Sequence, residues 1–127
     1  VVSLREGEWR RQEFAAGARG LYGSTLAVLG VGHIGREVVK RALAFGMHVR
    51  CWSRSLTLAE AQALGAEHCT SPEEAADGAH AVSVHVPLDG TTRGLVDEGL
   101  LRRLQPGAIV VNMSRGEVVD EAALVRL

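Results

Sequence analysis

The sequence predicts an α/β fold built on a parallel β-sheet, and two observations carry this prediction. Short aliphatic runs alternate with amphipathic, helix-like segments along most of the 127 residues. Hydrophobic residues make up 46% of the chain but aromatic residues only 4%. The core must therefore be aliphatic, as it is when parallel strands are covered on both faces. A chain of this length has room for one domain with a sizeable core.

Five segments have the aliphatic or β-branched character of strands: residues 25–29, 47–52, 66–70, 80–86 and 108–112. In a doubly wound sheet the first of them is central, and their spatial order is third, second, first, fourth, fifth. Glycines interrupt residues 1–22, and we expect this segment to connect a substrate-binding domain to the present one rather than to join the sheet. The domain itself is assigned to residues 23–127.

Helix signals lie between the strands. The longest helix is expected at residues 33–45 and ends at Gly46. Its apolar stripe consists of Ile34, Val38, Ala42 and Phe45. Four shorter helices are expected at residues 57–64, after the cap residue Ser71, from the cap Asp97 to Leu104, and after the cap Asp120.

A glycine-rich turn joins the first strand to the longest helix. Gly30, Gly32 and Gly35 have the spacing G-x-G-x-x-G, and the order strand, turn, helix is typical of a dinucleotide-binding turn. The first glycine permits the tight turn, the second lets backbone approach a pyrophosphate, and the third lets helix and strand pack closely. The alternative is a structural turn that binds no ligand. The expected fold is a Rossmann-like, doubly wound parallel sheet.

Composition disfavours several classes of function. A net charge of −1 without a clustered basic face argues against a nucleic-acid partner. No apolar run reaches the roughly 18 residues that span a membrane. Cys51 and Cys69 are too far from a C-x-x-C pattern for a zinc site, and no other metal site is indicated. We expect Cys51 to be a buried free thiol and the protein to be cytoplasmic.

Candidate site residues gather after the strands, because ligands bind at the carboxyl edge of such a sheet. Ser53 and Arg54 stand where an NAD binder has an acid for the ribose 2′-hydroxyl. Arg54 either pairs with a 2′-phosphate or points into solvent. His85 fits a packed or hydrogen-bonded strand residue better than a catalytic base. Arg115, after the fifth strand, either holds a substrate carboxylate through two parallel hydrogen bonds or is an ordinary surface arginine.

The sequence resembles the D-isomer-specific 2-hydroxyacid dehydrogenases over about residues 21–124, in the family's order and spacing. The resemblance rests on the glycine turn and on five further phrases. These are Ala44-Phe45-Gly46-Met47, His85-Val86-Pro87-Leu88, Thr92-Arg93-Gly94-Leu95, Leu104-Gln105-Pro106-Gly107-Ala108 and, most specific, Asn112-Met113-Ser114-Arg115-Gly116 with the residues that follow to Leu124.

The resemblance implies reversible hydride transfer between a nicotinamide cofactor and a 2-keto acid or its D-2-hydroxy acid, and we expect a homodimer. It implies that Arg115 binds the substrate carboxylate and helps to polarise the carbonyl. The positions it places at the cofactor are Gly30, Gly32, His33, Ile34, Gly35, Ser53, Arg54, Val86, Pro87, Thr92, Met113 and Ser114.

Two departures from the family's pattern qualify this expectation. The family's acid/base histidine and its glutamate lie beyond Leu127, and the substrate-binding domain is outside this sequence. Because hydride transfer needs a proton donor, we expect this chain alone to bind a dinucleotide weakly and to turn over no 2-keto acid. The second departure, Ser53-Arg54-Ser55 in place of the usual Asp, shifts the expected cofactor from NAD toward NADP, with both usable.

A different class of function is a non-catalytic NAD-binding scaffold, like the family's transcriptional corepressor relatives. The presence of Arg115 favours the enzyme. A nucleotide-sensing module would explain the glycine turn but not the phrase from Asn112 to Leu124.

Overall fold

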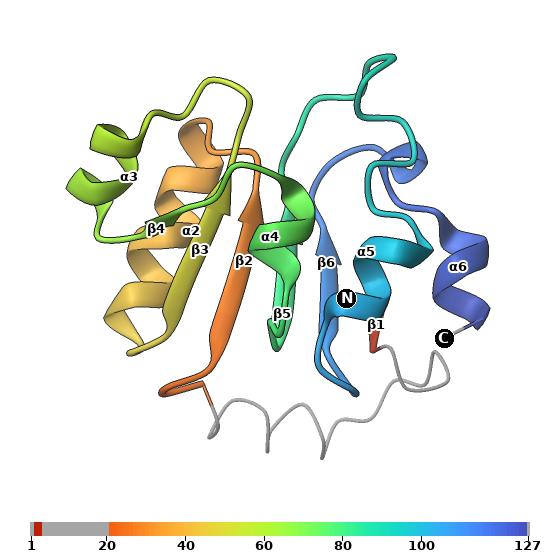
Figure 1. Ribbon diagram of the computed structural model, residues 1–127, viewed down its shortest axis with the longest axis horizontal. Coiled ribbons are helices and arrows are strands. Elements are labelled where there is room, and N and C mark those ends of the chain that lie inside the picture. The colour runs from red at the N-terminus through yellow and green to blue at the C-terminus, as the bar shows by residue number, and fades with distance from the viewer. Residues whose placement is uncertain (1, 4–20, 127) are drawn as a thin grey trace.

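The structure, a computed structural model, describes residues 2–3 and 21–126 (Figure 1). Its strands form one six-stranded sheet in the order β1-β6-β5-β2-β3-β4. Their bounds are β1 (Val2–Ser3), β2 (Thr25–Leu29), β3 (His48–Trp52), β4 (Glu67–His68), β5 (Ala81–Val84) and β6 (Ile109–Asn112). Strands β2 to β6 pair in parallel, with β2 between β3 and β5. The predicted order of the five parallel strands is confirmed, although β4 and β5 are shorter than predicted.

One prediction about the sheet is wrong. Val2 and Ser3 were expected outside the sheet, but they pair antiparallel with Val110 and Ile109 of β6. Without them β6 would be an edge strand with unpaired backbone groups, which a short antiparallel strand satisfies. Residues 4–20 lie outside the described residues, so their assignment to a connector stays a prediction.

Helices cover both faces of the sheet, as a doubly wound fold requires (Figure 1). In β2, Leu26 and Val28 belong to one buried cluster, whereas Ala27 and Leu29 belong to the other. The first cluster lies under α2 (His33–Ala44) and α3 (Leu58–Leu64). The second lies under α4 (Pro72–Ala76), α5 (Glu98–Arg103) and α6 (Glu121–Arg126), and a 3-10 turn, η1 (Gly116–Val118), precedes α6.

Three of the short helices begin at the predicted cap residues Ser71, Asp97 and Asp120, and Thr57, predicted as the first helical residue, caps the fourth. The side chains of Thr57, Ser71 and Asp97 each accept a hydrogen bond from a backbone N–H of the first turn that follows. Asp120 does the same for α6, accepting from the N–H of Ala123 at 3.2 Å. These bonds satisfy N–H groups that have no acceptor within the helix. The caps explain why such short helices start where they do.

The predicted apolar stripe of α2 is wrong in part. Gly35, Val39 and Ala42 face the sheet, while Ile34 and Phe45 are 61% and 64% exposed. The helix turns Gly35 toward the sheet because only a glycine can approach the backbone there. Ile34 is then rotated by about 100° around a helix with 3.6 residues per turn, which takes it off the buried face.

Two further features bear on function. Cys51 and Cys69 are buried free thiols, as predicted for Cys51. Burial raises the pKa of both thiols, that of Cys69 to about 12, so neither is a reactive thiolate at neutral pH.

Within the described residues, none of the helices combines the length and apolarity that crossing a membrane needs.

Candidate functional site

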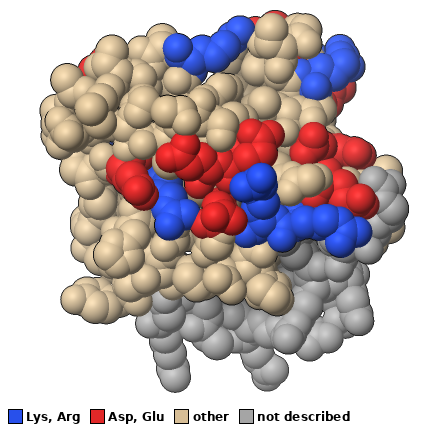
Figure 2. Space-filling view, in the orientation of Figure 1, with Lys and Arg blue, Asp and Glu red and all other residues tan. Residues whose placement is uncertain are grey.

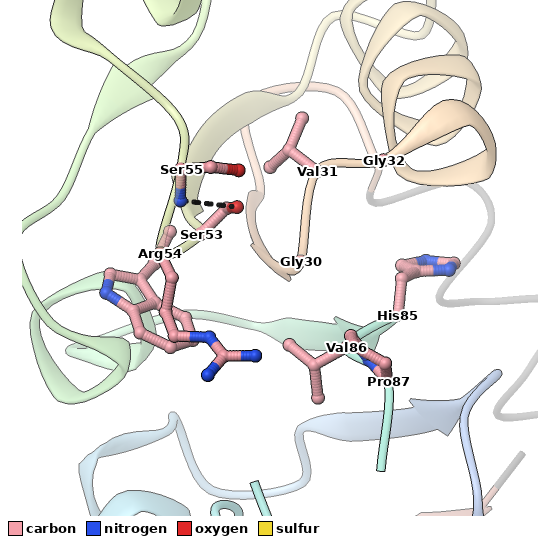
Figure 3. Close-up of a pocket in the computed structure, with 10 residues that line it drawn as sticks. Gly30, Val31, Gly32, Ser53, Arg54, Ser55, His85, Val86 and Pro87 are labelled. Carbon is pink, nitrogen blue, oxygen red and sulfur yellow. Dashed lines mark hydrogen bonds between the residues drawn. The ribbon is translucent and has the colours of Figure 1, made fainter. Parts of the chain in front are cut away.

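A cleft opens at the carboxyl ends of β2, β3 and β5 (Figure 3). Its volume is about 240 Å³, below the roughly 300–1,000 Å³ of typical small-molecule pockets, so it would hold part of a dinucleotide. The glycine turn lies between the loop after β3 and the end of β5 (Figure 3). The lining residues are Gly30, Val31, Gly32, Trp52, Ser53, Arg54, Ser55, His85, Val86 and Pro87.

Gly30 fixes the turn against the two neighbouring strands. Its φ of +93° is in the region that favours glycine, and a Cβ there would stand 2.7 Å from the backbone nitrogen of Val86. The N–H of Gly30 donates to the carbonyl oxygen of Trp52 at 2.7 Å. The turn is therefore held between the ends of β5 and β3, which sets the floor of the cleft.

Gly35 brings α2 down onto this turn. A Cβ on Gly35 would stand 2.4 Å from the carbonyl oxygen of Gly30, closer than real Cβ contacts. The close approach directs the N-terminus of α2 at the cleft.

Gly32 differs from the other two glycines. Its φ of −87° suits any residue, and among the residues that the structure describes a Cβ there would meet nothing within 4 Å. The chain's own packing thus gives no reason for a glycine at this position. A Cβ would instead occupy open space beside the cleft, where a ligand approaching the backbone would lie. Gly32 fits the predicted contact with a pyrophosphate.

The N-terminus of α2 also suits a phosphate. Unlike the four shorter helices, α2 has no side-chain cap, and its first turn has no acidic residue. The first N–H groups of a helix have no acceptor within the helix, and they carry a partial positive charge. Together with the open space at Gly32, this arrangement fits the anionic centre of a dinucleotide.

Arg54 has hydrogen-bond partners within the chain, which neither sequence-based alternative anticipated. It lines the cleft, yet its guanidinium neither stands free nor points simply into solvent. Nη2 donates to Oδ2 of Asp89 and Nη1 to Oγ1 of Thr91, both at 2.8 Å. Hydrogen bonds from Thr91 and the guanidinium of Arg54 hold the pKa of Asp89 well below its usual range. The carboxylate of Asp89 therefore stays ionised at any neutral or mildly acidic pH.

Thr92 lies inside the loop after β5 rather than along the cleft. It is 2% exposed, and its hydroxyl donates to the carbonyl oxygen of Pro87 at 2.5 Å and accepts from the N–H of Asp89 at 2.8 Å. Its contribution to the site is to hold the shape of the loop that carries Pro87.

His85 is hydrogen-bonded, as expected, although it lies directly after β5 and not in the strand. Its Nε2 lies 2.6 Å from the hydroxyl oxygen of buried Ser83, and Figure 3 shows its ring turned away from Arg54. Burial lowers the pKa of His85, so the ring is neutral at pH 7. It lines the cleft as a neutral side chain.

The end of β6 lies beside the end of β5. The hydroxyl of Ser114 donates to the carbonyl oxygen of Val86, and its N–H donates to Oδ1 of Asn112 at 2.9 Å. Met113 is exposed. Arg115 is also exposed, and in the described part of the chain its guanidinium has no ion pair or hydrogen bond. A free guanidinium at this edge is available to a carboxylate.

Six of the predicted site residues line the cleft: Gly30, Gly32, Ser53, Arg54, Val86 and Pro87. The others surround it without lining it. His33 and Ile34 are exposed in the first turn of α2, and Gly35 packs beneath the turn. Thr92 and Ser114 support the loops, and Met113 and Arg115 lie at the end of β6.

Three residues that line the cleft, Val31, Trp52 and Ser55, were not predicted; a fourth, His85, was expected only as a packed strand residue, and the contact of Asp89 with Arg54 was not predicted either. The first three adjoin predicted residues in the sequence, so widening each motif by one position would have found them. Asp89 pairs with a residue 35 positions away, and no local pattern signals that contact.

Comparisons with known proteins agree with this geometry. Residues 2–127 match the family described as "D-isomer specific 2-hydroxyacid dehydrogenase, NAD binding domain". The chain is 38% identical to D-3-phosphoglycerate dehydrogenase of Methanocaldococcus jannaschii over 124 residues, which are 98% of this chain and 23% of that protein. It is 36% identical to hydroxypyruvate reductase of Thermotoga maritima over 124 residues, 98% of this chain and 39% of that protein.

The fold matches a solved structure of the same kind. It aligns with an apo form of D-mandelate dehydrogenase from Rhodotorula graminis with a TM-score of 0.79 and 32% identity, over 91% of this chain and 34% of that one. The chain therefore spans a quarter to about two fifths of these relatives. It belongs to the family of NAD-binding domains of D-isomer specific 2-hydroxyacid dehydrogenases.

Proposed function

We propose that this chain holds the nicotinamide dinucleotide in an oxidoreductase that transfers a hydride between NAD(P)H and a 2-keto acid or D-2-hydroxy acid. The substrate class is that of phosphoglycerate dehydrogenases or glyoxylate/hydroxypyruvate reductases, in keeping with the relatives' names. The observation that carries the proposal is Gly32. It is a glycine without a steric reason inside the chain, at the uncapped N-terminus of α2 and beside a cleft.

The residues present fit the cofactor along the cleft. The backbone at Gly32 and the first turn of α2, with His33 and Ile34, would hold the pyrophosphate. Ser53 and Arg54 would face the adenosine ribose, because they directly follow β3, the strand next to β2 and its glycine turn. On the other side, Val86, Pro87, Met113 and Ser114 would border the nicotinamide half. Bound there, the cofactor supplies or accepts the hydride.

Arg115 would bind the substrate carboxylate. Its guanidinium is exposed and unpaired among the described residues, at the end of the strand beside β5. A planar guanidinium matches a carboxylate through two parallel hydrogen bonds, which fixes the carbonyl carbon relative to the cofactor. Orienting the substrate in this way is the part of catalysis that this chain's own side chain would perform.

Cofactor choice would lean toward NADP, with NAD also usable. Position 53 is a serine and not an acid that would repel a 2′-phosphate, and Arg54 lies beside it in the cleft.

We further propose a cytoplasmic homodimer. The free thiols Cys51 and Cys69 support a reducing compartment. The dimer follows from the family resemblance, and sedimentation of the complete protein would test it.

Steady-state assays of the complete protein test the proposed function. Absorbance of NADH or NADPH should fall when glyoxylate or hydroxypyruvate is added, and the reverse reaction should oxidise a D-2-hydroxy acid and leave its L-enantiomer untouched. Turnover with neither cofactor on any 2-keto acid, while the dinucleotide still binds, would instead favour the non-catalytic scaffold.

A further inference from the structure

A polar bridge joins the two sides of the cleft. Arg54 extends from the loop after β3, on one side of the glycine turn, toward the side on which Val86 and Pro87 lie (Figure 3). Its guanidinium is bound there by Asp89 and Thr91, in the loop after β5, at 2.8 Å each. The residue best placed to attract a 2′-phosphate is thus already bound to an anion of this chain.

The two carboxylate oxygens of Asp89 have different partners. Oδ1 accepts from the N–H and the hydroxyl of Thr91 at 2.8 and 2.6 Å, and from the N–H of Thr92 at 3.1 Å. Oδ2 accepts from Arg54. The loop therefore depends on Oδ1, whereas the bridge depends on Oδ2 and on the negative charge. An asparagine could keep the first set of bonds and lose the second.

We propose that Asp89 is a specificity-determining residue that limits the preference for NADP. It does so in two ways: it competes with the 2′-phosphate for Arg54, and its charge repels the phosphate. NAD, which has only a hydroxyl at that position, meets neither obstacle. The inference rests on the proposed function, because it requires a dinucleotide whose adenosine ribose lies at Ser53 and Arg54.

The bridge is weak enough to be exchanged. The side chains of Arg54 and Asp89 are 53% and 40% exposed, and ion pairs at this exposure are screened by water and salt. A phosphate monoester carries about −1.5 to −2 charges at neutral pH and offers three acceptor oxygens, so it can displace a single carboxylate oxygen. Asp89 therefore shifts the balance between the cofactors without excluding NADP.

Substitution of Asp89 in the complete protein tests the proposal. Asp89→Asn keeps an acceptor at Oδ1 and removes the charge. Dissociation constants for NADPH and NADH are measured by fluorescence titration, and we expect the ratio of the two constants to move toward NADPH by about two- to fivefold. Glu67→Gln is the matched control. It breaks the exposed Arg50–Glu67 pair, whose Nε–Oε2 distance is 3.0 Å, with the same change in net charge. It should leave the ratio unchanged.

The double variant separates the two effects. In an Arg54→Ala background, Asp89 and the 2′-phosphate no longer have a guanidinium to compete for, and only the repulsion between them remains. Asp89→Asn should therefore change the ratio of the NADPH and NADH dissociation constants by less than it does in the wild type. An unchanged ratio in Asp89→Asn, with wild-type unfolding, would overturn the role of Asp89 and leave the dinucleotide site standing. Absence of binding of either cofactor to the wild-type protein would overturn the proposed function together with this inference.

Discussion

A Cβ on Gly35 would stand 2.4 Å from the carbonyl oxygen of Gly30, so α2 rests directly on the turn that leaves β2. The contact is backbone against backbone, and no side chain can move aside to relieve it. Because of this contact, the N-terminus of α2 has one position in the stable domain: a shift of α2 away from the turn would open the buried cluster around Val39.

Gly35→Ala should therefore destabilise the fold. Forcing one methyl group into a closed contact typically costs about 1–3 kcal/mol in the free energy of unfolding. Chemical denaturation of the variant would measure this loss. Gly90→Ala is the control, since a Cβ at Gly90 would meet nothing within 4 Å, and it should unfold like the wild type. Equal stability of the two variants would mean that the helix has room to move.

Stability should fall on acidification through His85. Burial lowers the pKa of this histidine in the folded state below its ordinary value, so the unfolded chain binds the proton more tightly. The resulting contribution to stability is complete above about pH 6.5 and is lost as the pH falls toward the folded-state pKa.

Urea unfolding at several pH values would measure this dependence. His85→Gln removes the titrating ring, so its unfolding free energy should depend less on pH than that of the wild type in the same window. Parallel pH profiles for the two proteins would show that His85 is not the group responsible.

The order of the parallel strands and the helix caps could be predicted because their signals are local. The continuous apolar run of β2 and the cap at Ser71 each lie within a few residues. The rotation of α2 could not be predicted, because apolar spacing favoured Ile34 while the contact of Gly35 with Gly30 decides which face is buried.

In the candidate site, too, features with a local sequence signal could be predicted and contacts between distant segments could not. The glycine turn was identified from its own spacing. The partner of Arg54 was not, because Asp89 is brought to it by the parallel arrangement of β3, β2 and β5. The pairing of Val2 and Ser3 with β6 is likewise a contact between segments more than 100 residues apart.

Arg115 should control the handling of substrate and not the binding of cofactor. In the complete protein, Arg115→Ala should remove about 2–5 kcal/mol of transition-state stabilisation, roughly 30- to 5,000-fold in kcat/KM, if the carboxylate is desolvated when bound. Arg115→Lys keeps the charge but loses the planar fork, so it should also be impaired, though by less. Near-wild-type kcat/KM with a 2-keto acid for Arg115→Ala would remove this residue from the site.

Cofactor choice should respond to an acid at Ser53. Ser53→Asp places a carboxylate in the cleft, where it would repel a 2′-phosphate, and should shift the ratio of dissociation constants toward NADH by about three- to tenfold. Ser53→Asn, of similar size and without charge, should shift the ratio far less. Equal ratios for the two variants would place the 2′-position of the ribose away from Ser53.

Gly32→Ala tests whether the glycine turn and the N-terminus of α2 hold the pyrophosphate of a dinucleotide. A Cβ at Gly32 would meet no atom of the described residues within 4 Å, so unfolding should stay within about 1 kcal/mol of the wild type. The same methyl group would occupy the space predicted for the pyrophosphate. Titration of the complete protein with NADH and NADPH should then show both cofactors bound at least about tenfold more weakly than by the wild type. Unchanged affinity in a stably folded Gly32→Ala protein would contradict the account.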